Sequence, residues 1–182
     1  FSESIDKLTP YLDLVATAIG ADIVPVVGEN RILAYYGLEV LNSKPRVGFQ
    51  ALIQHIKKET LTLTDVVFVI APRINAAGRM KHGNYAVSLL KEADATKAQL
   101  ASEAIETFNT IRRTLEQEIT KAALLQIDQN QEQEKATTVV YSPEWNKGVI
   151  GIVASRLIET YYRPTLVFTK SGDFLTASAR SV

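Results

Sequence analysis

Cysteine is absent from the 182-residue chain, and histidine occurs only twice. The first absence excludes disulfides and thiolate metal sites, and it fits a protein of a reducing cytosol. Basic residues (20) balance acidic residues (20), so a broad basic face is not expected and any contact with nucleic acid must come from local patches. No apolar run approaches the length of a membrane span, so we expect no membrane partner.

The composition is that of a folded protein, and the ends suggest a piece of a longer one. Apolar residues make up 46% of the chain, and its length suits one large domain or two small ones. No signal peptide precedes Phe1, and the chain stops at Val182 without a polar tail. We therefore expect a fragment of a longer cytoplasmic protein.

Helical spacing of apolar residues dominates the first half of the chain. Helices are predicted at residues 8–18, 31–41, 47–57 and 85–91. His55, on the third of these helices, is expected to face the surface rather than to bind a metal. The apolar run 66–70 follows a predicted N-cap but is too short to separate a helix from a strand.

A long amphipathic helix is predicted over 97–128, because apolar residues recur there every three, four or seven positions without glycine or proline. A coiled-coil dimer is the weaker alternative, since alanine and threonine lie on the apolar stripe, and we expect a monomer. Beyond the polar stretch 128–135, strands are predicted at 137–141, 165–169 and 174–178, with a helix at 148–162. The fold class is therefore α/β, with a helix-rich part (1–96), a long helix and a smaller part with a mixed sheet (129–182).

Two groups of residues suit phosphate oxygens. Arg73 and Arg79 flank the small residues of the stretch 71–79, and Pro72 is expected to turn this stretch toward the surface. Near the end of the chain, Ser178 and Arg180 lie two residues apart, on one side of a predicted strand. The alternative for these arginines is a set of surface ion pairs or helix caps.

A predicted helix start offers a further anion site. The segment 148–151 precedes the helix, whose first N–H groups favour anions, and this makes Gly148 and the nearby Asn146 candidates for phosphate binding. Tyr141 and Trp145 could stack on bases, although a tryptophan beside a turn more often fills a packing gap.

Three stretches, in order along nearly the whole chain, resemble the motifs of one family. They are Ala-Pro-Arg-Ile-Asn-Ala-Ala-Gly-Arg-Met at 71–80, the segment 12–31, and the segment 147–156 with Ser-Ala-Arg-Ser at 178–181. They resemble the RecJ family of the DHH phosphoesterase superfamily. The resemblance implies the end of a DHH domain (1–96), a connecting helix (97–128) and the start of a DHH-associated domain (129–182).

The same resemblance implies the activity of the longer protein. RecJ enzymes hydrolyse single-stranded DNA from the 5′ end in repair and recombination, with manganese or magnesium at a two-metal site. The paired-acid and Asp-His-His motifs of that site lie upstream of the matched region, so this fragment alone is expected to be inactive. A single-strand-binding protein is a partner that the family implies. The alternatives are a phosphodiesterase for cyclic dinucleotides or short oligonucleotides, and a catalytically dead DNA-binding scaffold.

Residue roles follow from the resemblance by position. Asp22 matches the acid of the last metal motif, and Asp13 is the alternative ligand, although it could be structural instead. Ser178, Arg180 and one of the arginines of the stretch 71–79 are assigned to the 5′ phosphate. The chain departs from the family at Asn146, where histidine is common and asparagine can bind but not titrate, and at Ala177, where the family has glycine.

Overall fold

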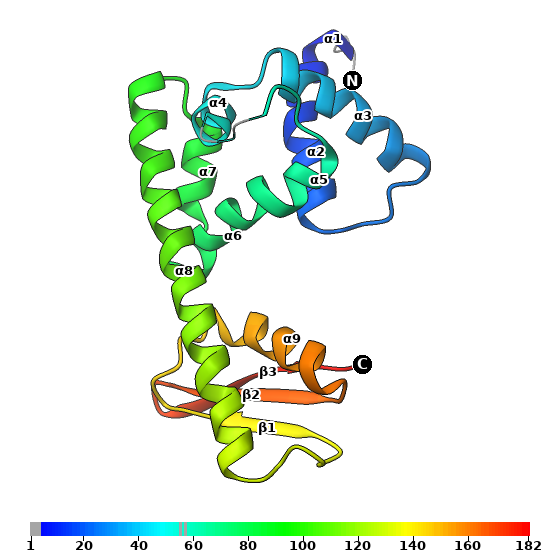
Figure 1. Ribbon diagram of the computed structural model, residues 1–182. Coiled ribbons are helices and arrows are strands. Elements are labelled where there is room, and N and C mark those ends of the chain that lie inside the picture. The colour runs from blue at the N-terminus through cyan, green and yellow to red at the C-terminus, as the bar shows by residue number, and fades with distance from the viewer. Residues whose placement is uncertain (1–4, 55, 57) are drawn as a thin grey trace. The chain divides into compact units, whose positions relative to one another are not determined.

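The computed structural model describes residues 5–54, 56 and 58–182, which form two compact units, Phe1–Asn109 and Thr110–Val182 (Figure 1). The first unit is helical, with α1 (Ile5–Leu8), η1 (Thr9–Tyr11), α2 (Leu12–Ala21), α3 (Gly28–Ser43), α4 (Val47–Ile53), α5 (Leu63–Asp65), η2 (Val66–Ile70), α6 (Ala71–Met80) and α7 (Asn84–Lys91). The second unit contains β1 (Thr138–Tyr141), α9 (Ile150–Tyr161), β2 (Thr165–Ser171) and β3 (Phe174–Arg180). The long helix α8 (Ala95–Gln129) contributes to both units. His55 lies outside the described residues.

The core of the first unit forms where apolar faces of its short helices meet. Phe49, Leu52, Ile70 and Leu89 are almost completely buried in this cluster, together with Ile105 of α8. None of these helices is long enough to be stable alone in water, so their stability comes from burying these faces together. The prediction that Val47 and its successors form a helix is confirmed, although α4 ends at Ile53.

Glycine permits two close helix contacts in this unit. A methyl group on Gly37 of α3 would lie 2.2 Å from the Leu12 carbonyl oxygen, and one on Gly48 of α4 would lie 2.1 Å from that of Leu89. Both distances are far below any contact that a real side chain tolerates. The absence of a side chain at these positions therefore lets the helix backbones approach each other.

The expectation that the stretch 71–79 turns out of the buried structure is wrong, because it forms helix α6. Pro72 lies in the first turn of α6, where a missing N–H is tolerated, and the π-helix η2 leads directly into it. Ala76 and Ala77 are fully buried, so the small residues of this stretch serve helix packing. The same finding decides the undetermined run 66–70 in favour of helix.

The sheet of the second unit has the order β1–β2–β3, with β1 parallel and β3 antiparallel to β2. This confirms the predicted mixed sheet and its three strands. Helix α9 lies against the sheet (Figure 1). Its side chains Val153 and Leu157 are fully buried. Antiparallel pairing places Ser178 opposite Val167 and Arg180 opposite Thr165. Val167 and Thr165 are fully buried, so Ser178 and Arg180 share the face of the sheet that α9 covers.

The domain limits expected from the sequence stay a prediction. The two compact units divide between Asn109 and Thr110, inside α8. Ala98 and Ile105 of α8 are buried in the first unit, and Ile119, Ala123 and Ile127 are buried in the second. No helix among the described residues has the length and the apolar character that crossing a membrane requires.

A buried arginine joins the polar stretch after α8 to the sheet. Arg163 is 7% exposed, and its guanidinium donates to the Thr138 hydroxyl (2.7 Å) and to the Glu132 carbonyl (2.8 Å). It also donates to the carbonyls of Gln133 and Lys135. The planar fork of arginine fits this cage of neutral oxygens, which lysine could satisfy only in part.

We expect Arg163→Ala to loosen this part of the second unit, because it removes the donors for several carbonyls at once. Each hydrogen bond from a charged group contributes about 1.5–3 kcal/mol. Amide hydrogen exchange in 132–141 should accelerate by at least about tenfold. The control is Arg113→Ala, which changes an exposed arginine on α8. Equal exchange rates in the two variants would contradict the role given to Arg163.

Candidate functional site

Three groups meet where α9 begins beside the end of β3. A methyl group on Gly151, in the first turn of α9, would lie 3.3 Å from the Arg180 guanidinium nitrogen Nη2 and 3.3 Å from Ser178 Oγ. The backbone of α9 therefore lies within contact distance of both side chains. We call Gly151, Ser178 and Arg180 the β3–α9 cluster. It combines a guanidinium, a hydroxyl and a helix N-terminus, all of which favour anions.

Asn146 and Gly148 shape the turn that leads into this helix. The Gly148 N–H donates to the Asn146 side-chain oxygen (2.8 Å), and the Asn146 carbonyl accepts from the N–H groups of Val149 (3.0 Å) and Ile150 (3.2 Å). The Gly148 N–H is thus already engaged. The Gly151 N–H has no backbone acceptor among the described residues, so it remains available as a donor at the start of α9.

Sequence reasoning singled out Gly148 within the segment 148–151 and missed the particular role of Gly151. A signal was present, because glycine interrupts an otherwise apolar helical run at Gly151. Glycine inside a helix costs about 1 kcal/mol relative to alanine. Such a residue indicates that something approaches the backbone closely.

The candidate phosphate-binding arginines Arg180 and Arg73 differ in the contacts that they already make. Arg180 donates to the carbonyl of its neighbour Ala179 (2.7 Å) and has no carboxylate partner among the described residues. Arg73 of α6 instead forms an ion pair with Glu106 of α8 (Nε to Oε2, 2.6 Å) and also donates to the Val69 carbonyl. Of these two arginines, Arg180 can therefore bind a ligand without breaking an existing ion pair.

Arg79 lies in the last turn of α6, where its positive charge interacts favourably with the helix dipole. Its side chain is exposed, whereas that of Arg73 is partly buried. Of the two arginines expected near phosphate, Arg79 is thus the more accessible. The stretch is a packed helix that presents one arginine to solvent.

Asp22 is the candidate metal ligand, and it sits in an unusual place. It caps the C-terminus of α2, where its N–H donates to the Ala18 carbonyl (3.0 Å) and its side chain is exposed. No hydrogen bond or ion pair joins its carboxylate to another described residue. A negative charge at a helix C-terminus is unfavourable. Asp22 begins the turn that follows α2.

Backbone strain follows directly after Asp22. Ile23 has a φ of 53°, which is rare for a β-branched residue, and its apolar side chain is 77% exposed. Strain of this kind costs about 1–3 kcal/mol and is concentrated at functional sites. The exposed acid and the strained neighbour together make this turn a candidate functional site.

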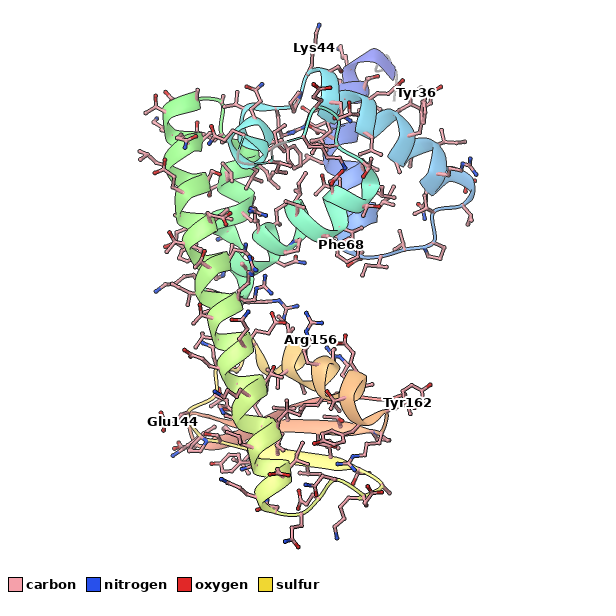
Figure 2. All side chains as sticks on the ribbon, viewed as in Figure 1. Tyr36, Lys44, Phe68, Glu144, Arg156 and Tyr162 are labelled. Atoms are coloured by element: carbon pink, nitrogen blue, oxygen red, sulfur yellow. The ribbon has the colours of Figure 1, made fainter. Side chains whose placement is uncertain are left out.

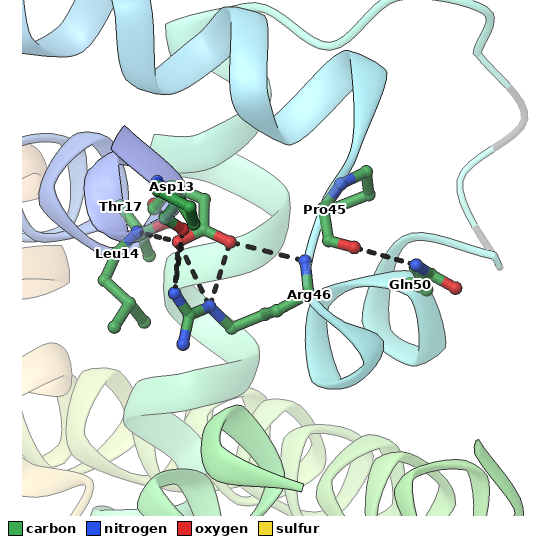
Figure 3. A network of polar contacts seen from close by, with 7 residues as sticks. Asp13, Leu14, Thr17, Pro45, Arg46 and Gln50 are labelled. Carbon is green, nitrogen blue, oxygen red and sulfur yellow. Dashed lines mark hydrogen bonds and ion pairs between the residues drawn. The ribbon is translucent and has the colours of Figure 1, made fainter. Parts of the chain in front are cut away.

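Asp13, the alternative ligand, is completely buried and its oxygens are occupied (Figure 3). Arg46 donates Nη2 to Oδ1 (2.8 Å) and Nε to Oδ2 (2.9 Å), and the Leu14 N–H donates to Oδ1 (2.7 Å). The Arg46 guanidinium also donates to the Pro10 carbonyl. Asp13 therefore joins α2 to the start of α4, and a metal ion would have to displace Arg46 to reach it.

A two-metal site needs several carboxylates or imidazoles within a few ångströms of one another. The described residues contain no group of three or more such side chains that could hold a metal ion. Asp22 can supply one oxygen ligand and no more. The residues present therefore do not fit a complete metal centre.

Comparison with known proteins gives a consistent result over this whole region. No protein-family model matches the chain. Curated relatives carry the name single-stranded-DNA-specific exonuclease RecJ. The protein from Salmonella typhimurium is 35% identical over 183 residues, which cover 97% of this chain and 32% of that protein. The protein from Bacillus subtilis is 36% identical over 180 residues, which cover 94% of this chain and 22% of that protein.

Solved structures show the same similarity to RecJ. RecJ from Thermus thermophilus in complex with Mg²⁺ matches with a TM-score of 0.86 at 34% identity, covering 96% of this chain and 27% of that one. An exonuclease RecJ bound to manganese matches with a TM-score of 0.84 at 34% identity, covering 96% and 43%. The chain thus spans about a third or less of the length of the curated relatives described above. Over the part that it spans, the chain belongs to the RecJ family.

Proposed function

We propose that the protein carrying this chain hydrolyses single-stranded DNA from the 5′ end with manganese or magnesium, and that this segment holds the 5′ phosphate. The observation that carries the proposal is the β3–α9 cluster. Its guanidinium has no carboxylate partner among the described residues, and it lies beside a hydroxyl and the start of a helix. A terminal phosphate carries more negative charge than a phosphate within the strand, and these groups favour it accordingly.

Each member of the cluster has a separate task. The Arg180 guanidinium donates two parallel hydrogen bonds to phosphate oxygens and supplies the positive charge. The Ser178 hydroxyl and the Gly151 N–H complete the set of donors from two other directions. A side chain at Gly151 would project against both partners at 3.3 Å, so glycine leaves the space that a phosphate oxygen needs. Asn146 contributes by fixing the turn before α9.

Two bound divalent ions would supply the positive charge that lowers the pKa of an attacking water and offsets charge on the phosphate that is cleaved. Asp22 is our proposed ligand from this segment, because its carboxylate is exposed and forms no hydrogen bond or ion pair within the described part of the chain. The other ligands must come from elsewhere in the protein. We place the enzyme in the cytoplasm, since its proposed substrate is DNA. We propose that it is a monomer, because alanine and threonine on the apolar stripe of the long helix disfavour a coiled-coil dimer. A single-strand-binding protein is the partner that the family implies.

The test compares full-length wild type with Arg180→Ala on two otherwise identical oligonucleotides, one with a 5′ phosphate and one with a 5′ hydroxyl. A charged hydrogen bond to phosphate contributes about 1.5–3 kcal/mol, so the variant should bind the phosphorylated strand roughly ten- to a hundredfold more weakly. Binding of the hydroxyl strand should change little. Both affinities are measured at one salt concentration, because contacts with the strand backbone depend on salt.

Arg113→Ala, which removes an exposed arginine outside the cluster, is the matched control and should keep the preference for a 5′ phosphate. If Arg180→Ala weakens both strands equally, Arg180 is a general backbone contact. Binding of the 5′ end by this cluster would then be refuted.

A further inference from the structure

Glu116 of α8 is a buried carboxylate that holds two arginines. It is 8% exposed, and it accepts from Arg112 Nη1 (2.7 Å) and from Arg156 Nε (3.1 Å). Arg112 lies one turn earlier on α8, whereas Arg156 lies on α9 (Figure 2). All three residues belong to the second unit. A carboxylate buried to this extent is stable only when paired, so Glu116 requires these partners.

Arg156 links Glu116 on α8 to a second carboxylate on α9. Arg156 also donates to Glu159, one turn later on α9 (3.1 Å). Hydrogen bonds to Glu116 and then to Glu159 raise the pKa of Arg156 above its usual range. Arg156 therefore keeps its positive charge.

Apolar side chains do not fill the space beside the Glu116–Arg156 ion pair. A cavity of about 380 Å³ is lined by Glu116, Arg156, Leu124 and Thr120, among others. The Thr120 hydroxyl is buried there and has no hydrogen-bond partner among the described residues. Apolar contacts are non-directional, so they define the rotation of a helix less sharply than a hydrogen-bonded ion pair does. The Glu116–Arg156 pair adds such a directional contact between α8 and α9 to the apolar packing of α9 on the sheet.

The position of α9 decides the geometry of the β3–α9 cluster. Arg156 follows Gly151 by five residues, or roughly 7.5 Å along the helix axis. A methyl group on Gly151 would lie 3.3 Å from both Ser178 Oγ and Arg180 Nη2, so the start of α9 lies near both side chains. A shift of about 1 Å is enough to break the alignment of the three donors on one phosphate.

We infer that Glu116 is a positioning residue for the 5′-phosphate site, because through Arg156 it fixes α9 and thereby holds Gly151, at the start of that helix, beside Ser178 and Arg180. This inference rests on the proposed function. Glu116 touches no part of the cluster itself. Glu116 acts on the alignment of the donors in the cluster. Its replacement should therefore change the affinity for a terminal phosphate more than it changes the stability of the protein.

The experiment measures, in the full-length protein, the ratio of affinities for 5′-phosphorylated and 5′-hydroxyl strands. Glu116→Gln keeps the shape but loses the charge, and Arg156→Lys keeps the charge but loses the Nε–H donor. Both should lower the ratio by about fivefold or more, and the double variant should lower it no further than the stronger single one. Arg156 is half exposed, so its lysine variant should fold even if Glu116→Gln does not.

Glu159→Gln is the matched control, since it changes an exposed carboxylate that contacts the same guanidinium, and it should leave the ratio unchanged. An unchanged ratio in Arg156→Lys, or equal losses in Arg156→Lys and Glu159→Gln, would overturn the inference. Failure of the proposed function is a separate outcome. In that case Arg180→Ala has no effect on the ratio, whatever the Glu116 variants do.

Discussion

Asp22→Ala in the full-length protein should lower the rate of single-stranded DNA hydrolysis by about a hundredfold or more, while DNA binding remains. A metal ligand stabilises charge that develops during the reaction, and a loss of roughly 3 kcal/mol corresponds to this change in rate. The carboxylate is exposed at the end of α2, so its removal should not disturb the core. Initial rates on labelled oligonucleotides and binding in the absence of turnover measure the two effects.

Metal affinity gives an independent readout of the same change. Manganese titration, followed by calorimetry or by electron paramagnetic resonance, should find weaker binding in Asp22→Ala. Glu29→Gln, which changes an exposed acid in the first turn of α3, should leave both rate and metal affinity near those of wild type. Near-normal turnover in Asp22→Ala, together with loss of turnover in a stably folded Asp13→Ala, would show that Asp13 is the ligand.

Local patterns were sufficient to predict most of the secondary structure. The uninterrupted spacing of Ala101, Ile105 and Phe108 predicted α8, which extends over Ala95–Gln129. Short β-branched runs bounded by turn residues predicted the three strands, and Gly172 has the positive φ that the turn between β2 and β3 requires. These signals depend on neighbours in the sequence, and so they can be read without knowledge of the tertiary structure.

The stretch 71–79 could not be assigned correctly because proline is ambiguous. Pro72 ends a helix when it lies in the interior and suits a helix when it lies in the first turn. The π-helix η2, which precedes it, cannot be recognised from composition. Burial of Ala76 and Ala77 likewise depends on how the helices pack, which the sequence does not show. These small residues were therefore interpreted as an accessible surface stretch, whereas the structure buries them in a helix contact.

Sites depend on contacts between distant residues, which sequence patterns do not contain. The side chains of Ser178 and Arg180 were predicted to lie on one face, and strand alternation was enough for that. The approach of Gly151 to them depends on how α9 crosses β3. Likewise, the pairing of Arg73 with Glu106 joins residues 33 positions apart, and only the fold reveals it.

Loss of the Asp13 carboxylate should destabilise the first unit strongly. In Asp13→Asn, the Arg46 guanidinium keeps its charge but loses its bidentate partner in a largely buried place. Removing one member of a buried ion pair costs roughly 3–5 kcal/mol, because the remaining charge is left without compensation. Urea unfolding should measure this loss of stability, and faster amide hydrogen exchange in α2 and α4 should locate it. Asp65→Asn would be a poor control, since that acid also forms a helix cap. Glu29→Gln is a suitable control and should change the free energy of unfolding by less than about 0.5 kcal/mol.

A double variant separates a structural role of Asp13 from a role in metal binding. Replacing both members with apolar residues of similar size, as in Asp13→Leu with Arg46→Met, leaves no uncompensated charge, and buried pairs exchanged in this way often retain their stability. We expect the double variant to recover most of the stability that Asp13→Asn loses. If it also recovers turnover in the full-length protein, Asp13 serves only to join α2 to α4. If stability returns while turnover and manganese affinity stay low, the carboxylate itself is needed and Asp13 contributes to the metal site.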